Sequence, residues 1–418
     1  MAKFLLGDLT LASAVILSPL ERISDVGFRR LCHRNAGAAL TWTEMVRASE
    51  LVRPHGTDRV DLFAARAAPR GGRGANLIDT YDPDTPTGVQ LLVDCTTARD
   101  GHGVDLLKAA LEQLEEGAAT DRPEWNNICA IDLNFGCPAP AISRRGAGPA
   151  QLRRRSKVRA LFEVLHDWRC RTSLNIGAVG AKIRLGNNER EQHYKVYLPV
   201  ADAAAEIGLN YIAVHARHGG QRSAEAPSWE AIAEVKQAVG SALKVIGNGD
   251  IRTPSDVKQI VALTGCDGVM IGRAAMRNPW CLRQLSAAFH NLKEDVECHG
   301  SRSFGPSEWP TDSELELAAA ENTAWSANRR AAPRYRRFRE ENFERLRRMA
   351  RTAHIPNDNG SSCVAVAVER DQDGAMGSWY REWSAAAARR RHQDRLDDRH
   401  TGLGARRDSS SHAREQLR

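Results

Sequence analysis

The stretch Cys129–Pro138 reads CAIDLNFGCP, an apolar run that ends in Asn, Gly, Cys and Pro. An apolar run followed by turn-forming residues is typical of a buried strand that ends in a tight loop. Gly136 lets the backbone pass close to a ligand, and Pro138 fixes the direction in which the chain leaves the turn. A cysteine there can act as a nucleophile or, with an ordinary pKa of about 8.5, as a proton donor. We therefore interpret Cys137 as a site residue rather than as a packing residue.

Similar short apolar runs recur along the chain, with helical patterns between them. The expected strands are residues 14–18, 39–43, 88–93, 129–134, 180–185, 210–215, 244–248 and 267–271. The expected helices include residues 25–35, 104–116, 156–167, 192–207, 229–239, 254–263 and 274–290. Eight strands in strict alternation with helices predict an α/β fold of the (β/α)₈ TIM-barrel type. A doubly wound sheet is the alternative, but no G-x-G-x-x-G turn follows an early strand.

The charge of the chain is distributed unevenly between the expected domains. We expect a barrel over residues 1–290, a linker over 291–311, a smaller helical region over 312–352 and an irregular or disordered basic tail over 353–418. Residues 329–418 hold 21 Arg, no Lys and 13 acidic residues, a balance of +8 within a total of +7. The rest of the chain is therefore nearly neutral, at −1. This asymmetry favours a polyanionic partner for the C-terminal region, with solvated surface charge as the alternative.

Cysteine usage and hydropathy narrow the class of protein. The nine cysteines are odd in number and include no C-x-x-C pair, which argues against a zinc site and against a disulfide framework. We expect a reducing, cytoplasmic location and no metal. No run approaches the roughly 18 apolar residues of a membrane span, so no membrane association is expected. Residues 1–20 partly imitate a signal peptide, but Asp8 interrupts the apolar stretch, and we interpret 14–18 as a first buried strand.

The expected strands end in polar or glycine residues, and the carboxyl ends of barrel strands share one rim. Two Gly-containing turns, Gly247–Ile251 and Ile271–Ala274, follow the last two strands and suit a phosphate, with Arg273 supplying charge. Lys182 could stabilise negative charge on a reduced flavin ring, or pair with the core carboxylate of Asp132. His215 could donate a hydrogen bond to a cofactor, or be a satisfied core histidine. The Gln90 amide offers the donor and acceptors that a pyrimidine-like ring edge requires.

Over about residues 14–290, the chain resembles the tRNA-dihydrouridine synthase family, which is flavin-dependent. The Cys137 turn, with the arginine loop that follows it, is the most diagnostic part of the resemblance. The motifs are Ser18–Asp25, Thr43–Met45, Val89–Leu91, Asn134–Pro138, Arg144–Gly148, Lys182–Arg184, Val214–Arg217, Gly247–Ile251 and Gly272–Arg273. The family commonly has Thr and Tyr where this chain has His218 and Ser223, which affects the expected substrate contacts more than flavin binding.

The resemblance implies a TIM barrel with a helical C-terminal domain that helps to grip tRNA. It also implies that FMN reduces the C5=C6 bond of uridine in tRNA, with hydride added at C6 and NADPH as the reductant. Cys137 would protonate C5 as the proton donor, and Asn134 would contact the uracil. The implied FMN contacts are Pro19, Leu20, Glu21, Gln90, Lys182, His215, Asn248, Gly249, Asp250, Gly272 and Arg273.

We assign Arg144, Arg145 and Arg217 to the substrate, and we expect a monomer. Two other functions stay open. One is an FMN barrel that reduces a free small pyrimidine or an enone. The other is an RNA-binding barrel without turnover. A flavin spectrum, and activity on tRNA compared with free uracil, would separate the three.

Overall fold

The structure, a computed structural model, describes residues 3–52 except 22 and 25, and residues 84–93, 102–118 and 128–294. All of these lie in one compact unit, Met1–Leu346, and none lies in the other, Arg347–Arg418. The last described helix, α11 (Cys281–Glu294), continues four residues past the predicted end of the barrel. The predicted helical region over 312–352 and the predicted tail over 353–418 lie outside the described residues.

Eight parallel strands form a ring. Ile16 and Leu40 form a parallel bridge, and the Leu17 N–H donates to the Leu40 carbonyl at 2.9 Å, which joins the first strand to the second. A short strand, β5 (Val46–Arg47), also pairs with β6. The order is β3 (Val15–Leu17), β11 (Gly268–Ile271), β10 (Lys244–Asn248), β9 (Tyr211–His215), β8 (Ala178–Arg184), β7 (Ile128–Phe135), β6 (Thr87–Leu92) and β4 (Thr41–Trp42). This arrangement confirms the predicted (β/α)₈ barrel.

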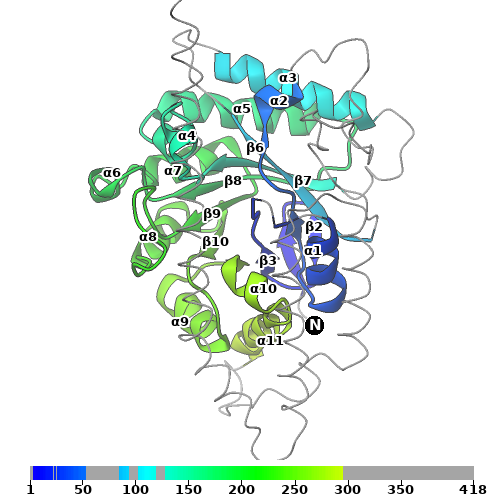
Figure 1. Ribbon diagram of the computed structural model, residues 1–418, viewed down its shortest axis with the longest axis vertical. Coiled ribbons are helices and arrows are strands. Elements are labelled where there is room, and N and C mark those ends of the chain that lie inside the picture. The colour runs from blue at the N-terminus through cyan, green and yellow to red at the C-terminus, as the bar shows by residue number, and fades with distance from the viewer. Residues whose placement is uncertain are drawn as a thin grey trace, which may run out of the picture. The chain divides into compact units, whose positions relative to one another are not determined.

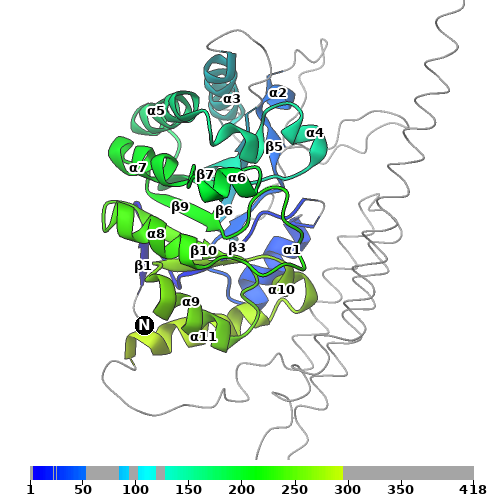
Figure 2. The same ribbon diagram turned by 90° about the vertical axis from the view of Figure 1, so that its left-hand side faces the viewer.

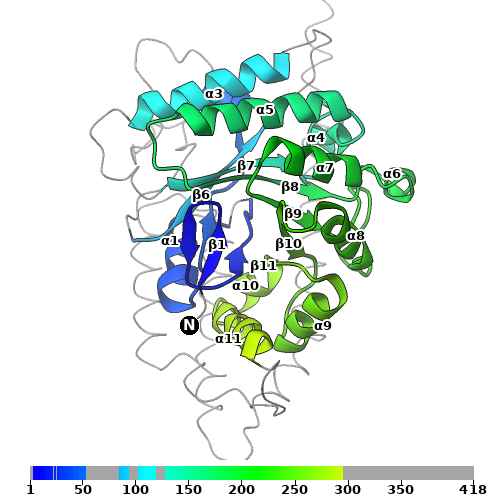
Figure 3. The same ribbon diagram turned by 180° about the vertical axis from the view of Figure 1, so that it is seen from behind.

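Helices surround the strands on the outside, as Figures 1 and 3 show. The helix α5 (Arg155–Arg171) is representative, because Val158, Leu161, Phe162, Leu165 and Trp168 recur every three or four residues and are all buried. The other helices are α1 (Val26–Arg30) with a π-helical turn (Leu31–Asn35), α2 (Ala48–Leu51), α3 (His102–Ala118), α4 (Pro140–Ser143), a 3₁₀ turn (Gly148–Gln151), α6 (Glu189–His193), α7 (Leu198–Ile207), α8 (Glu230–Val239), α9 (Pro254–Thr264) and α10 (Arg273–Arg277).

Two helices predicted as continuous are each divided. Lys195 adopts a left-handed conformation (φ 51°), which ends the helical path between α6 and α7. Asn278 is extended before Pro279, and the residue before a proline disfavours helical geometry, so α10 and α11 are separate. The start of α9 agrees with its predicted cap, because Thr253 and Asp256 form a reciprocal capping box.

An N-terminal hairpin that the sequence did not predict covers one end of the barrel. It consists of β1 (Phe4–Leu6) and β2 (Leu9–Leu11). The Asp8 N–H donates to the Gly177 carbonyl at 2.8 Å, just before β8 begins, and Arg169 pairs with Asp8 at 2.5 Å. Figure 2 shows the hairpin at one end of the barrel and α4 and α10 at the other. The site must therefore lie at the carboxyl ends of the strands.

Candidate active site

The turn after β7 holds Cys137 in place through a side-chain cap. The Asn134 Oδ1 accepts hydrogen bonds from the backbone N–H groups of Gly136 and Cys137, both at 2.9 Å. Arg184, at the end of β8, donates from Nε to the Gly136 carbonyl at 2.9 Å. A Cβ on Gly148 would lie 2.7 Å from the Cys137 carbonyl, and Gly148 has a φ of +62°. The loop thus folds back against the turn at a position that only glycine suits.

Burial raises the pKa of the Cys137 thiol above its ordinary value. A backbone hydrogen bond at Ala139 opposes this effect, whereas the negative charge of Glu21 raises the pKa further. The thiol is therefore protonated at neutral pH. A nucleophile requires the thiolate, whereas a proton donor requires the thiol. Of the two roles considered from sequence, this environment favours the proton donor.

A chain of hydrogen bonds runs from the Cys137 turn into the barrel. Asn134 donates from Nδ2 to the Oε1 of Gln90 at 2.6 Å, and Gln90 donates from Nε2 to Asp132 at 2.5 Å. The Tyr211 hydroxyl donates to the other oxygen of Asp132 at 2.8 Å. Burial raises the pKa of Asp132 to about 6, against the lowering effect of the hydrogen bonds from Gln90 and Tyr211. Asp132 is therefore ionised at neutral pH although every direct partner is uncharged.

Lys182 stands next to this chain, because it pairs with Asn134 across the β7–β8 ladder. Burial lowers the pKa of Lys182 to about 8, and the charge of Arg184 lowers it further, whereas Asp132 raises it. No ion pair joins these two described residues, so the alternative of a lysine paired directly with Asp132 is not what the structure has. The Lys182 ammonium group is therefore buried near the mouth of the barrel and loses its proton more readily than an ordinary lysine.

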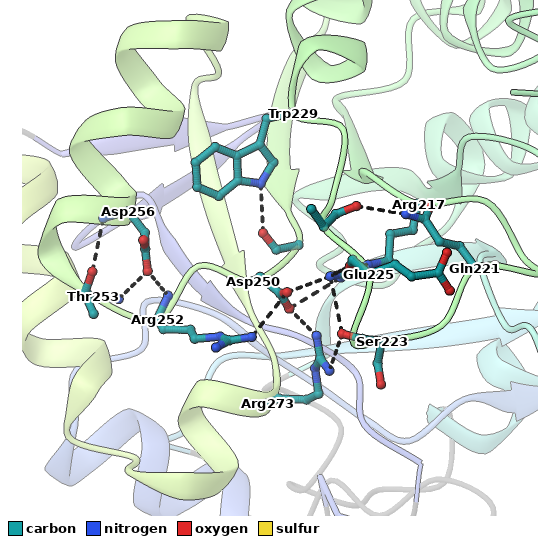
Figure 4. A network of polar contacts seen from close by, with 12 residues as sticks. Arg217, Gln221, Ser223, Glu225, Trp229, Asp250, Arg252, Thr253, Asp256 and Arg273 are labelled. Carbon is teal, nitrogen blue, oxygen red and sulfur yellow. Dashed lines mark hydrogen bonds and ion pairs between the residues drawn. The ribbon is translucent and has the colours of Figure 1, made fainter. Parts of the chain in front are cut away.

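A second carboxylate, Asp250, organises the opposite part of the rim (Figure 4). It pairs with Arg217 at 2.6 Å, with Arg252 at 3.2 Å and with Arg273. Burial alone would raise the pKa of Asp250, but the Arg217 hydrogen bond and the charges of the three arginines hold it below its ordinary value. The carbonyls of Ser223 and Glu225 also accept from these arginines. Figure 4 shows the three arginines around Asp250, with the two carbonyls bonded to Arg217 and Arg273.

The predicted substrate residue Arg217 is buried and bonded to other residues of the mouth. It is 1 % exposed, and its guanidinium donates to Asp250 and to the Glu225 carbonyl. These contacts hold the β9 loop in place, so we interpret Arg217 as a support of the site. Its Nη1 also lies 3.4 Å from the Nε2 of His215, which makes that nitrogen the acceptor and places the proton on Nδ1.

Three predicted cofactor residues can be described by their contacts. Asn248 donates from Nδ2 to the Met270 carbonyl at 2.6 Å and so joins the ends of β10 and β11. Burial and four nearby cations lower the pKa of His215 well below its ordinary value, so its ring is neutral. Arg273 is 33 % exposed at its side chain, with Asp250 and the Ser223 carbonyl as partners. A phosphate at Arg273 would share the guanidinium with Asp250.

The two turns predicted to hold a phosphate have backbone geometry that glycine permits, and the second begins a helix. Gly249 has a φ of 133°, which favours glycine, and Asp250 is left-handed with a φ of 50°. Gly272 is the N-cap of α10, so the N–H groups at the start of this helix have no partner within the helix itself. Backbone N–H groups beside a guanidinium are a donor set suited to a phosphate, so these residues fit the phosphate of a flavin mononucleotide.

A family model described as Dihydrouridine synthase (Dus) matches residues 16–304. The chain belongs to the dihydrouridine synthase family. It is 31% identical over 292 residues to a "Probable tRNA-dihydrouridine synthase" of Mycobacterium tuberculosis, covering 68% of this chain and 64% of that relative. It is 29% identical over 285 residues to "tRNA-dihydrouridine synthase B" of Pseudomonas syringae, covering 68% and 71%. The chain thus spans just under two thirds of the mycobacterial relative it matches.

Similarity to solved structures is weaker. A crystal structure of DHODH from Eimeria tenella aligns with a TM-score of 0.44 at 13% identity and covers 71% of this chain and 85% of that one. At this level the similarity does not bear on function. The family model, by contrast, confirms the family expected from the sequence motifs.

The dihydrouridine synthase barrel brings the predicted site residues to one rim. They lie close to the carboxyl ends of β3, β6, β7, β8, β9, β10 and β11, or in the segments that follow. The predicted substrate residues Arg144 and Arg145 are exposed and line a cavity of about 290 Å³ with Arg153 and Arg154. In the part of the chain that the structure describes, no group of three or more His, Cys, Asp or Glu could hold a metal. No helix among those residues is long and apolar enough to cross a membrane.

Sequence reasoning missed three residues that support the site. Asp132 was considered only as a partner for Lys182, although it accepts from Gln90 and Tyr211. Tyr211 begins β9 and carried no motif. Arg184 joins the Cys137 turn to the β9 loop, because it also donates to the His218 carbonyl at 2.9 Å. An Asp inside an apolar strand was the available signal for Asp132, because buried carboxylates require partners.

Proposed function

We propose that this protein is an FMN-dependent tRNA-dihydrouridine synthase, which reduces the C5=C6 bond of uridine in tRNA. The observation that carries the proposal is Cys137, a half-buried thiol with a raised pKa, held on a capped turn at the carboxyl end of β7. The names of the relatives support the substrate. Because tRNA is the proposed substrate, we place the protein in the cytoplasm.

The cofactor would lie across the mouth of the barrel. Asn248, Gly249, Asp250, Gly272 and Arg273 would hold its phosphate. Pro19, Leu20 and Glu21 follow β3, which pairs with β11, so they would border the same part of the cofactor. The ring would lie near Gln90, Lys182 and His215. Bound and reduced, FMN supplies a hydride for C6 of the uracil. The charge of Lys182 would favour an anionic ring, and its lowered pKa makes that charge dependent on pH.

Cys137 would hold the proton for C5. Its raised pKa keeps the thiol protonated at neutral pH, which a general acid requires. Asn134 lies three residues earlier and binds the Cys137 N–H, so a base in contact with Asn134 would lie beside the thiol. A uridine must leave its stack to enter this mouth, which favours uridines in accessible loops of tRNA.

Positive charge outside the mouth would bind the tRNA backbone. Arg144 and Arg145 are exposed on the rim beside the Cys137 loop. The Arg-rich C-terminal region, including the predicted helical region over 312–352, would supply a second set of phosphate contacts. We propose NADPH as the reductant that regenerates the flavin.

Three measurements test this function. The purified protein should show the absorption spectrum of a bound flavin, and its released cofactor should be FMN rather than FAD. With NADPH it should form dihydrouridine in tRNA but not reduce free uracil. A folded protein that takes up no FMN would exclude both reductase functions, and reduction of free uracil alone would favour a small-molecule reductase. Mapping dihydrouridine in cells with and without the protein would identify the uridine that is modified.

A further inference from the structure

The hydrogen bonds that lead from Cys137 into the barrel all run in one direction. The backbone N–H groups of Gly136 and Cys137 donate to Asn134, Asn134 donates to Gln90, and Gln90 donates to Asp132. At the far end Tyr211 also donates to Asp132. One end of this chain consists of backbone N–H groups, which can only donate. The other end is the Asp132 carboxylate, which accepts one hydrogen bond on each of its oxygens, from Gln90 and from Tyr211.

These two ends fix how both amides are oriented. An Asn or Gln amide can rotate by half a turn and exchange its oxygen with its nitrogen. If Gln90 rotated, its oxygen would face the Asp132 carboxylate, and its nitrogen would face the donating nitrogen of Asn134. If Asn134 rotated, its nitrogen would face two backbone N–H groups. Every one of these contacts would join two donors or two acceptors, and unpaired buried polar groups cost about 1–3 kcal/mol each.

The orientation determines what a ligand meets at Asn134. The Asn134 oxygen has two lone pairs, and the Gly136 and Cys137 N–H groups use both. The nitrogen has two hydrogens, and among the described residues Gln90 accepts from one of them. Position 134 can therefore offer a ligand a donor and no acceptor. Asn134 is 9 % exposed, so the group facing that donor would be largely desolvated.

We propose that Asp132 is a positioning residue that determines which pyrimidine base is accepted. It accepts the last hydrogen bond of the chain, and this keeps Asn134 oriented so that it offers a ligand only a donor. The donor suits a carbonyl oxygen of a base and rejects an amino group at the same place. This inference rests on the proposed function for the identity of the base, but the direction of the chain does not depend on it.

Two isosteric substitutions can reverse the chain. In Asn134→Asp the carboxylate still accepts from the turn, but Gln90 must then donate to it, and the Gln90 oxygen faces the Asp132 carboxylate. Adding Asp132→Asn supplies a donor at that point, and the new Asn oxygen can still accept from Tyr211. The double variant therefore satisfies every bond, and the two bonds that join positions 132, 90 and 134 run in the opposite direction. It also carries the same net charge as the parent.

The test compares thermal unfolding and flavin binding of full-length parent, N134D, D132N/N134D and D132L/N134D. The D132L/N134D variant removes the Asp132 charge as D132N does, but its Leu has a similar branched shape and no donor. We expect N134D to lower the unfolding temperature by several degrees and D132N/N134D to recover most of the loss. D132L/N134D should recover clearly less. Equal recovery by D132L and D132N would show that charge relief alone acts, and would overturn the proposed direction.

Activity on tRNA supplies the second readout. The double variant should bind FMN as the parent does and yet form at least ~10-fold less dihydrouridine, because position 134 now offers only acceptors. Parental activity in a recovered double variant would overturn the specificity role. If the parent itself forms no dihydrouridine, the proposed function fails, whereas the unfolding comparison still decides whether Asp132 sets the direction of the chain.

Discussion

The mouth of the barrel has two carboxylates with opposite kinds of partner, the buried Asp132 and the half-buried Asp250. Asp132 accepts from the uncharged groups of Gln90 and Tyr211, and burial raises its pKa to about 6. Asp250 is partnered by three arginines, which hold its pKa below the ordinary value in spite of burial. Burial opposes ionisation at both sites, so the charge of the partners decides the outcome.

The difference indicates two kinds of recognition in one mouth. Uncharged partners give the Asp132 side a fixed direction of hydrogen bonding, which suits the edge of a base. Charged partners give the Asp250 side a concentration of guanidinium groups, which suits a phosphate. Each of the following predictions tests this division between the two sides, beginning with the largest expected effect.

The largest effect should arise on the Asp132 side, where the proton donor lies. Cys137→Ala should reduce dihydrouridine formation by about 10²–10⁴-fold, because general acid catalysis typically contributes that much. Flavin content and tRNA affinity should stay at parental values. Cys170→Ala, at an exposed cysteine of α5, is the control and should be fully active. Full activity in Cys137→Ala would show that another group donates the proton.

The largest loss of stability should arise on the Asp250 side. Asp250→Asn leaves the Arg217 guanidinium, 2 % exposed at its side chain, without its charged partner. Removing one member of a buried pair typically costs 3–5 kcal/mol, and we expect about 3 kcal/mol in the free energy of unfolding, measured by denaturant titration. Asp8→Asn removes the carboxylate of a pair in which that aspartate is 81 % exposed, and should cost less than about 1 kcal/mol. Equal losses would show that the arginine cluster is not coupled to Asp250.

The contributions of the two carboxylates to the free energy of unfolding should depend on pH in opposite directions. The pKa of Asp132 rises from 3.8 to about 6 on folding, so the folded state binds the extra proton, and stability is lost as pH rises between these values. Relative to Asp132→Asn, the parent should lose up to about 3 kcal/mol over that window. The pKa of Asp250 is lowered, so its contribution is present above 3.8 and is lost only as pH falls below it. Unfolding of both variants and the parent from pH 3 to pH 8 measures this contrast.

The smallest effect should come from the exposed arginines on the two sides of the rim. Arg144→Ala with Arg145→Ala should flatten the slope of log tRNA affinity against log salt by about 1–2, because each lost phosphate contact removes about 0.7–0.9. Arg222→Ala, with a side chain 91 % exposed on the Asp250 side, is the matched control. A larger change in this slope for Arg222→Ala would show that the tRNA runs along the Asp250 side of the mouth.

Sequence patterns predicted the barrel well because each strand is short, apolar and followed by turn residues. The predicted strand over 244–248 and β10 have the same bounds. The N-terminal hairpin was missed because its strands have three residues each and one face of it is held by tertiary contacts with Gly177. Lys195 was missed because nothing local marks a left-handed lysine within a helical pattern.

Site residues could be predicted from the sequence only where a polar residue or a cysteine stands at the end of a predicted strand. Cys137, Asn134 and Arg273 were predicted as site residues because they lie at or just after the ends of predicted strands. The role of Asp132 depends on Gln90 and Tyr211, which lie 42 and 79 residues away in the chain. The sequence shows the charge of Arg217 but not its burial, and in the structure that charge faces Asp250.

The ring closes between its first and last strands, and this has a consequence for how the protein is made. Val15–Leu17 pairs with Val269–Ile271, so the first strand cannot complete its ladder until more than half of the chain has been synthesised. A nascent chain therefore exposes an unpaired apolar strand edge for most of translation, and such edges promote aggregation. Contacts between distant residues also slow folding. We expect yield in cells to depend on chaperones that bind apolar segments at the ribosome more than on the stability of the finished barrel.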